Sequence, residues 1–202
     1  IEVGIGMVAD LKEKGYNVLA TGEMGIGNTT TSSAVCSVLL DQSVEKVTGK
    51  GAGLTNKDLE HKIEVIRQSI ALNKVNADDP LDVLAKVGGL DIAGMAGCYI
   101  GGAALNIPVF IDGFISSVAA LIAIRLVPEC APYLFPSHCS NEPAGRMILD
   151  AIGKQPYIFA NMCLGEGTGA VMGFTIADYA FKAYWELPSF EQTNFGTYEE
   201  LN

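Results

Sequence analysis

Apolar residues along the chain follow two patterns, helical stripes and short uninterrupted runs. Residues 54–74 show the first pattern, because Leu59, Ile63, Ile66 and Ile70 fall on one stripe of an amphipathic helix. The same patterns predict helices over residues 1–14, 30–41, 78–88 and 114–127, and strands over 16–21 and 107–112. Residues 132–153 indicate a proline-rich connection and a helix, and residues 157–187 a glycine-rich turn that leads into a long helix.

Strands separated by helices are typical of a parallel sheet that is covered on both faces. We therefore expect an α/β fold, with a Rossmann-like parallel β-sheet and helices on both faces. Residues 89–105 are small and apolar, and Gly94, Gly97, Gly101 and Gly102 would let this segment pack very closely on a neighbouring helix.

Composition narrows the classes of function. Hydrophobic residues make up 49% of the 202 residues and charged residues 18%, which is enough for a large core and argues against disorder. The net charge of −10 argues against nucleic-acid and anionic-membrane binding. A small anionic ligand stays open, because backbone N–H groups bind phosphate whatever the net charge. The longest apolar stretches are too short for a membrane span, because polar residues interrupt them at Asp91, Asn106, Asp112 and Arg125.

The five cysteines are scattered and form no CxxC pair, and only two histidines are present. A metal site is therefore not expected, and buried thiols in a reducing cytoplasm are the simplest interpretation. His61 is expected on a helix surface and His138 in a loop. The chain starts inside a helical pattern and without an initiator methionine, so we expect it to be a portion of a longer protein.

Candidate chemistry gathers in glycine-rich turns. Residues 21–30, 111–114 and 164–170 are such turns, and residues 49–54 form a fourth that precedes Lys62. Ligands of parallel α/β sheets bind outside the carboxyl ends of the strands. The sequence therefore predicts a ligand site where these turns meet.

The turn "TGEMGIGNTT" matches neither standard phosphate motif. Gly22 and Gly27 have the Walker spacing, but Asn28 stands where the lysine belongs, and Thr30 replaces the third glycine of a dinucleotide fingerprint. Exposed N–H groups at the start of a helix, with Asn28 or Thr29 as N-cap, would still favour a monophosphate. The alternative is a tight strand–helix turn with no ligand.

Two carboxylates accompany these turns. Glu166 lies between Gly165 and Gly167, so its neighbours shield it poorly and it can face a ligand as a general base. It could instead only complement the dipole of the following helix. Glu23 in the first turn would be a second carboxylate near the site.

Five motifs follow one another along the chain: "GEMGIGNTTTSSA", "GKGAGL" before "HKIEVI", "GGLDIAGMAG", "IDGF", and "LGEGTGA" before a long helix. Together they resemble one family, nicotinate-nucleotide–dimethylbenzimidazole phosphoribosyltransferase. The resemblance implies transfer of the phosphoribosyl group of nicotinate mononucleotide to 5,6-dimethylbenzimidazole, which gives α-ribazole 5′-phosphate and nicotinate, with no metal or cofactor. The departing nicotinate already carries a positive ring nitrogen. The reaction therefore needs a base for the benzimidazole N–H proton rather than an acid for the leaving group.

The resemblance also implies roles for individual residues. Glu166 would be the catalytic base, and Glu23 would position Lys62 or the ribose hydroxyls. The remaining substrate-binding residues would be Gly25, Gly27, Asn28, Thr29, Lys62, Gly113 and Ser140 around the phosphoribosyl group and Met24 and Leu164 as apolar walls near the benzimidazole.

Members of the family carry a substantial N-terminal region that nothing in these residues matches. The expected organisation is an α/β core over residues 1–175, with 176–202 as a C-terminal helix and tail that belong to a small helical domain. Phe181, Tyr184 and Trp185 would serve helix packing or an interface, and a cytoplasmic homodimer is expected. The alternatives are a non-catalytic α/β module that binds a mononucleotide and a phosphate-loop NTPase, against which Asn28 argues.

Overall fold

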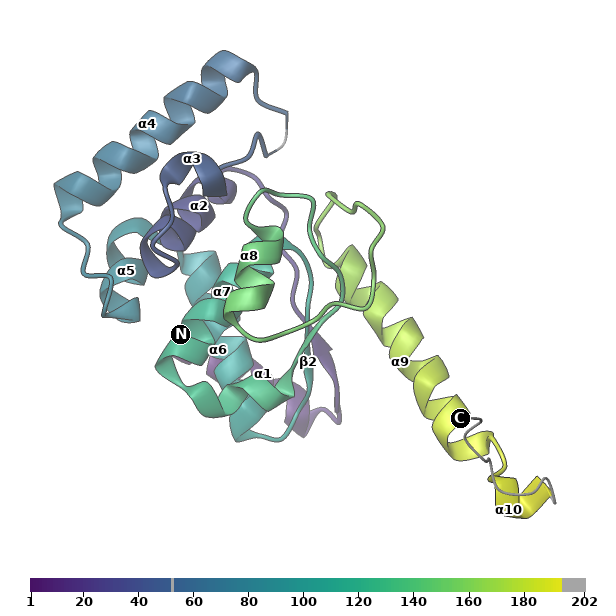
Figure 1. Ribbon diagram of the computed structural model, residues 1–202. Coiled ribbons are helices and arrows are strands. Elements are labelled where there is room, and N and C mark those ends of the chain that lie inside the picture. The colour runs from purple at the N-terminus through teal and green to yellow at the C-terminus, as the bar shows by residue number, and fades with distance from the viewer. Residues whose placement is uncertain (52, 194–202) are drawn as a thin grey trace, which may run out of the picture.

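The computed structural model describes residues 1–51 and 53–193 (Figure 1). Three short strands form one sheet in the order β1-β2-β3, with bounds β1 (Leu19–Ala20), β2 (Val109–Ile111) and β3 (Leu134–Pro136). The helices are α1 (Glu2–Glu13), α2 (Asn28–Leu39), α3 (Val44–Val47), α4 (Asn56–Asn73), α5 (Pro80–Val87), α6 (Leu90–Ala104), α7 (Phe114–Leu126), the 3-10 helix η1 (Pro128–Tyr133), α8 (Gly145–Ala151), α9 (Thr168–Glu186) and α10 (Phe190–Thr193).

The sheet is parallel throughout, as expected. Leu19 pairs with Val109, and Val109 pairs with Leu134 on its other side. Because side chains alternate between the faces of a strand, these residues and Ile111 point to the same face. That face carries the core, in which Val109, Ile111 and Leu134 are buried.

The opposite face of the sheet is covered by the start of α9. Phe110 stacks on Phe135 with ring centroids 5.6 Å apart and meets the edge of Phe174, which belongs to α9, at 4.8 Å. A Cβ on Gly173 would lie 2.8 Å from the Phe110 ring, so a glycine is needed for α9 to approach this closely. The expected α/β class, with helices on both faces of a parallel sheet, is confirmed.

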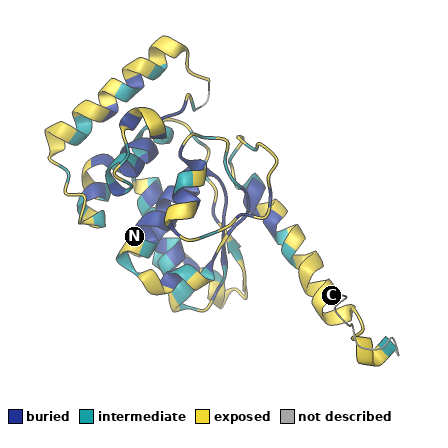
Figure 2. Cartoon of the chain, in the orientation of Figure 1, coloured by how far each residue is buried: buried dark blue, intermediate teal, exposed yellow. Residues whose placement is uncertain are grey.

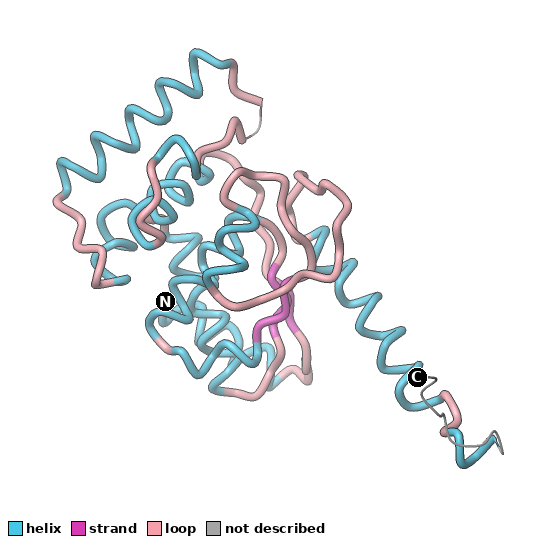
Figure 3. Tube along the Cα trace, viewed as in Figure 1, coloured by secondary structure: helices cyan, strands magenta, loops and turns pink. Residues whose placement is uncertain are grey.

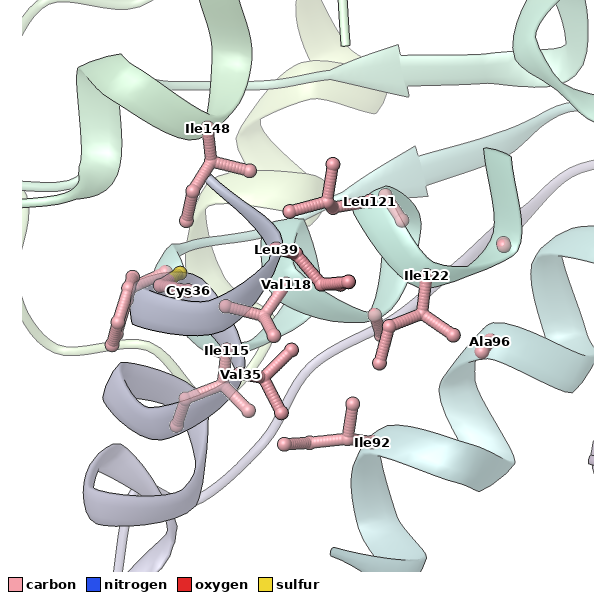
Figure 4. Packing of buried hydrophobic residues seen from close by; sticks show 14 of the residues in the cluster. Val35, Cys36, Leu39, Ile92, Ala96, Ile115, Val118, Leu121, Ile122 and Ile148 are labelled. Atoms are coloured by element: carbon pink, nitrogen blue, oxygen red, sulfur yellow. The ribbon is translucent and has the colours of Figure 1, made fainter. Parts of the chain in front are cut away.

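The main core lies between the sheet and helices α2, α6, α7 and α8 (Figure 4). Val118 and Ile122 of α7 lie at its centre and are fully buried. α7 is buried from Phe114 to Ala123, which is typical of a helix that is apolar on all sides. This central helix fixes the loop before it, residues 112–113, at the end of β2.

Helices α1 and α6 pack through glycine backbones. A Cβ on Gly97 would lie well inside van der Waals contact with the Ile1 carbonyl, and one on Gly101 would lie 3.0 Å from Ile5 Cα. Gly102 faces Ile107 and Val109 at similarly short range. The predicted close approach is confirmed at these glycines, whereas the Cβ position of Gly94 faces open space.

This difference gives a matched pair of substitutions. We expect Gly97→Ala to destabilise the protein by about 1–3 kcal/mol, because backbone atoms of α1 cannot move aside. Gly94→Ala should instead stabilise it by up to about 1 kcal/mol through helix propensity. Urea unfolding of both variants measures the two values, and equal effects would contradict the packing described here.

Helix α9 leaves the core after its first turns (Figure 1), and most of its length is exposed (Figure 2). Its exposed aromatic side chains include Phe181 at 64%, Tyr184 at 76% and Trp185 at 76%. Tyr184 and Trp185 contact each other edge to face, with ring centroids 5.0 Å apart. All three side chains are mostly exposed, so they add little to the core of the described residues. Among residues 1–51 and 53–193 no helix has both the length and the apolarity that a membrane span requires.

Most predicted elements agree with the structure to within a few residues, but the predicted strands were too long and the third strand was missed. The strands expected over 16–21 and 107–112 shorten to β1 and β2, and the third strand, β3, lies inside the segment interpreted as a proline-rich connection. β3 is an edge strand with Pro132 before it and Pro136 at its end, so it lacks the apolar run that marks β2. The turn at 164–170 follows no strand. The segment before it forms only an isolated bridge between His138 and Ile158.

Candidate functional site

The loops that follow the three strands gather at one end of the sheet, together with the loop that precedes α9 (Figure 3). They enclose a cavity of about 470 Å³. Its walls come from five segments of the chain and are lined by Glu23, Met24, Gly25, Thr29, Gly51, Asp112, Gly113, Phe114, Ile115, Ser116, His138, Ser140, Glu142, Met162, Cys163, Leu164, Gly165 and Glu166.

The first turn positions its backbone N–H groups at the start of α2. Gly25 and Gly27 have φ of +84° and +80°, a region that glycine adopts without strain. Gly27 is the N-cap of α2, so the expected cap at Asn28 or Thr29 is wrong by a residue or two. The carboxylate of Glu23 turns back on its own loop and accepts a hydrogen bond from the Gly25 N–H at 2.7 Å.

The first turn and the turn that carries Glu166 are joined directly. The Glu166 N–H donates to the Glu23 carbonyl at 3.0 Å, and a Cβ on Gly22 would lie well inside van der Waals contact with the Gly167 backbone. Glu166 itself has φ of +59°. A non-glycine residue pays about 1–2 kcal/mol for this conformation, and such strain gathers at functional sites. The Glu166 side chain is exposed and lies on the cavity wall.

A methyl group at Gly22 tests this junction. We expect Gly22→Ala to separate the two turns. If the chain catalyses the phosphoribosyl transfer that the resemblance implies, its turnover should fall at least about tenfold, because small misplacements at a reacting centre have large effects on rate. Gly6→Ala is the matched control, since a Cβ on Gly6 of α1 meets nothing within 4 Å. Equal turnover of the two variants would show that the junction has no part in the site.

Asp112 fixes the turn that carries Glu166 through hydrogen bonds to its backbone. This carboxylate follows β2, is 1% exposed, and accepts N–H groups of Gly167 at 2.9 Å, Gly169 at 2.8 Å and Ala170 at 3.3 Å. These donors are the first free N–H groups of α9, which a buried anion complements. Asp112 therefore caps α9 and fixes the backbone next to Glu166.

His138 lies beside Asp112, contrary to the expectation of an ordinary loop histidine. It is 2% exposed, its Nδ1 lies 3.1 Å from Ser137 Oγ and 4.0 Å from Asp112 Oδ1, and Gly169 leaves no room for a Cβ against its ring. Burial lowers the pKa of His138, and the smaller effect of the Asp112 charge raises it. The folded protein therefore disfavours the charged imidazole. As the pH falls below the ordinary pKa of histidine, the unfolded chain takes up this proton first, and the free energy of unfolding decreases. His61 is exposed on α4, as predicted.

Lys62 reaches the site from α4. It is 6% exposed, and its Nζ donates to Thr29 Oγ1 at 2.9 Å and to the Gly49 carbonyl at 3.0 Å. Burial lowers the pKa of Lys62, while the charge of Glu142 raises it. The carboxylate whose charge affects the pKa of Lys62 is thus that of Glu142, and not that of Glu23. The expectation that Glu23 positions Lys62 has no support in these contacts.

The structure brings most of the predicted site residues together. Seven of them, with Glu166, line the cavity, namely Glu23, Met24, Gly25, Thr29, Gly113, Ser140 and Leu164. Lys62 lies behind Thr29. Gly27 and Asn28 lie outside the lining, and the Asn28 amide donates to Asp91 Oδ2 of α6 at 2.8 Å.

Sequence reasoning missed Asp112, His138 and Glu142. Asp112 had a usable signal, since it ends the clearest strand directly before a glycine. The others follow β3, which was not recognised. Buried thiols were predicted, and Cys36 and Cys130 are buried, but Cys163 is exposed on the cavity wall. Within residues 1–51 and 53–193 no three His, Cys, Asp or Glu side chains are grouped as a metal site requires.

A parallel α/β sheet with a glycine-rich helix start and an exposed carboxylate on one cavity, and with a buried lysine behind Thr29, is typical of the class of proteins that bind a small phosphorylated ligand. Comparison with known proteins narrows this class. A family model described as phosphoribosyltransferase matches residues 1–195. The chain belongs to the nicotinate-nucleotide–dimethylbenzimidazole phosphoribosyltransferase family, as the resemblance predicted.

Proteins of that name show the similarity over essentially the whole chain. The one from Ruminiclostridium cellulolyticum is 53% identical and the one from Acetivibrio thermocellus 50% identical, over 100% and 98% of this chain. A crystal structure of CobT from Thermus thermophilus covers 96% of this chain with a TM-score of 0.89 at 32% identity. In each comparison the chain spans 57% of the other protein's length.

Proposed function

We propose that this chain holds the phosphoribosyl and proton-accepting part of an enzyme that transfers the phosphoribosyl group of nicotinate mononucleotide to 5,6-dimethylbenzimidazole. The products are α-ribazole 5′-phosphate and nicotinate. One observation carries the proposal: the Glu166 turn is hydrogen-bonded to the first turn, with Glu166 N–H to the Glu23 carbonyl at 3.0 Å. Glu166, the proposed base, and the first turn, the proposed phosphate-binding loop, thereby face one cavity.

In the proposed reaction Glu166 accepts the N–H proton of the benzimidazole while its other ring nitrogen attacks the anomeric carbon. Nicotinate leaves with the electron pair of the broken C–N bond, and attack from the opposite side inverts this carbon. The phosphate would bind near Gly25, Thr29 and Ser140, with the charge of Lys62 behind Thr29. Met24 and Leu164, which are 64% and 65% exposed, would contact the aromatic base.

A direct assay tests the proposal. The chain is incubated with nicotinate mononucleotide and 5,6-dimethylbenzimidazole, the products are separated by chromatography, and the full-length Ruminiclostridium cellulolyticum protein serves as reference. We expect α-ribazole 5′-phosphate and nicotinate to form in equal amounts. Binding of the mononucleotide without turnover would favour the non-catalytic module, and the absence of binding would refute the proposed site.

We further propose that the protein acts as a cytoplasmic homodimer, with residues 176–202 in a small helical domain next to the core of residues 1–175. Residues 194–202 lie outside the described part of the chain. The apolar and aromatic side chains exposed along α9, such as Trp185 at 76%, support an interface there. Five free cysteines are consistent with a reducing compartment. Light scattering of the purified protein measures the subunit number.

A further inference from the structure

A third carboxylate lies where the proposed function places the phosphate group. Glu142 belongs to the loop between β3 and α8 and lines the cavity together with Thr29 and Ser140. Its backbone N–H donates to Ser140 Oγ at 3.3 Å, which ties it to a predicted phosphate contact. A carboxylate at this place would repel a phosphate dianion, so its presence needs a physical explanation.

The side chain of Glu142 is held in the wall of the cavity. Its Oε2 is buried and has no hydrogen-bond partner among the described residues. A Cβ on Gly49 would lie well inside van der Waals contact with that oxygen, so only a glycine at this position leaves it room. An ionised oxygen without a donor is costly in such a place, whereas a protonated carboxyl group carries no charge to solvate.

Few charges surround Glu142. Lys62 of α4 directs its hydrogen bonds to Thr29 and the Gly49 carbonyl rather than to this carboxylate. Lys50 and Cys163 share a smaller neighbouring cavity with Glu142. The nearby Arg146 of α8 pairs with Asp150. Burial raises the pKa of Glu142, and Lys62 and the Gly51 backbone lower it by smaller amounts.

We propose that the phosphate subsite takes up its anion together with a proton, which Glu142 accepts. The inference rests on the proposed function, because it assumes a phosphorylated substrate in this cavity. An ionised Glu142 repels a phosphate dianion that enters beside it. A protonated Glu142 instead donates its O–H to a phosphate oxygen. Lys62 and Glu142 together carry no net charge, and protonation of Glu142 leaves the positive charge of Lys62 to meet the anion.

Linkage gives the sign of the pH effect. If binding takes up a proton on Glu142, the affinity weakens as the pH rises above the pKa of the free site, by up to about tenfold per pH unit. The affinity becomes independent of pH below that pKa. A subsite made of Lys62 and backbone N–H groups alone would not weaken until the lysine itself lost its proton.

The test is calorimetric titration with ribose 5-phosphate between about pH 7.5 and 8.5, where its phosphate is a dianion. Repeating it in buffers of different ionisation enthalpy gives the number of protons taken up. Inorganic sulfate, which does not titrate in this range, is the control anion. For the unaltered protein we expect uptake approaching a single proton with both anions, and an affinity that falls with pH.

Two variants identify the group that takes up the proton. Lys62→Arg keeps a permanent positive charge, so uptake should persist if Glu142 is the acceptor and vanish if Lys62 is. Glu142→Gln keeps an N–H donor without a titratable group, so it should bind ribose 5-phosphate at least about tenfold more tightly at about pH 8.5 than the unaltered protein does. Loss of uptake in Lys62→Arg would overturn the inference, even if Glu142→Gln fails to fold.

The remaining outcomes separate this inference from the proposed function. If ribose 5-phosphate binds to the unaltered protein without proton uptake, the role of Glu142 is wrong and the proposed function stands. If neither ribose 5-phosphate nor nicotinate mononucleotide binds, both are wrong.

Discussion

Glu166→Gln should lower transfer to the benzimidazole by a factor on the order of 10²–10⁴, the usual contribution of a general base. Glutamine keeps the length and the polar tip of the side chain but cannot accept the proton. The backbone contact of residue 166, from its N–H to the Glu23 carbonyl at 3.0 Å, does not involve the side chain and should survive. Binding of nicotinate mononucleotide should therefore change less than about threefold.

Turnover is measured by product chromatography and mononucleotide binding by calorimetry on the same preparations. Glu60→Gln is the matched control, because Glu60 is exposed on α4 and lies outside the lining of the cavity. Turnover of Glu166→Gln within about threefold of the control would show that another group accepts the proton. A parallel loss of binding and turnover would instead make Glu166 a binding residue.

Asp112→Asn is the second substitution with a large expected effect. Both carboxylate oxygens accept backbone N–H groups, with Gly167 on Oδ2 and Gly169 and Ala170 on Oδ1. An asparagine must present its NH₂ group to at least one of these donors, so a buried N–H loses its acceptor. We expect a loss of about 2–4 kcal/mol, since hydrogen bonds to charged groups contribute about 1.5–3 kcal/mol each.

For a chain of this size such a loss corresponds to a Tm lower by about 5–15 °C. The control is Asp150→Asn, which removes only the exposed pair with Arg146 at 2.8 Å and should change stability by less than about 1 kcal/mol.

If Asp112 also positions Glu166, its substitution should change the kinetic constants as well as the stability. At temperatures where Asp112→Asn is folded, kcat should fall more than KM rises, because the Glu166 turn is misaligned while the first turn still binds phosphate. Unchanged kcat in the folded variant would reduce Asp112 to a helix cap.

The sequence predicted those parts of the fold whose local signals are strong. α4 has a four-residue apolar stripe and an N-cap, Thr55, that accepts the Asp58 N–H at 3.2 Å, and its predicted extent was correct to within two residues. β3 could not be predicted because a short edge strand between prolines has no apolar run. Its register is set by pairing with β2, which is a tertiary contact.

The same distinction applies to the site. Glu166, Glu23 and Thr29 were predicted because glycine-rich turns mark them in the sequence, and all three line the cavity. His138 and Glu142 follow the unrecognised strand and become site residues only through folding. Asn28 differs from these residues, because it belongs to the motif but its amide donates to Asp91 on α6. A motif places a backbone, and packing decides where each side chain goes.

The position of Cys163 has a practical consequence. Its thiol is exposed on the cavity wall, whereas burial raises the pKa of Cys36 and Cys98 and that of Cys130 to about 11. Thiolates react and protonated thiols do not, so these three groups are protected from alkylation at neutral pH. A maleimide dye should therefore label Cys163 ahead of them, and its emission would report the filling of the cavity in real time, without a chromatographic step.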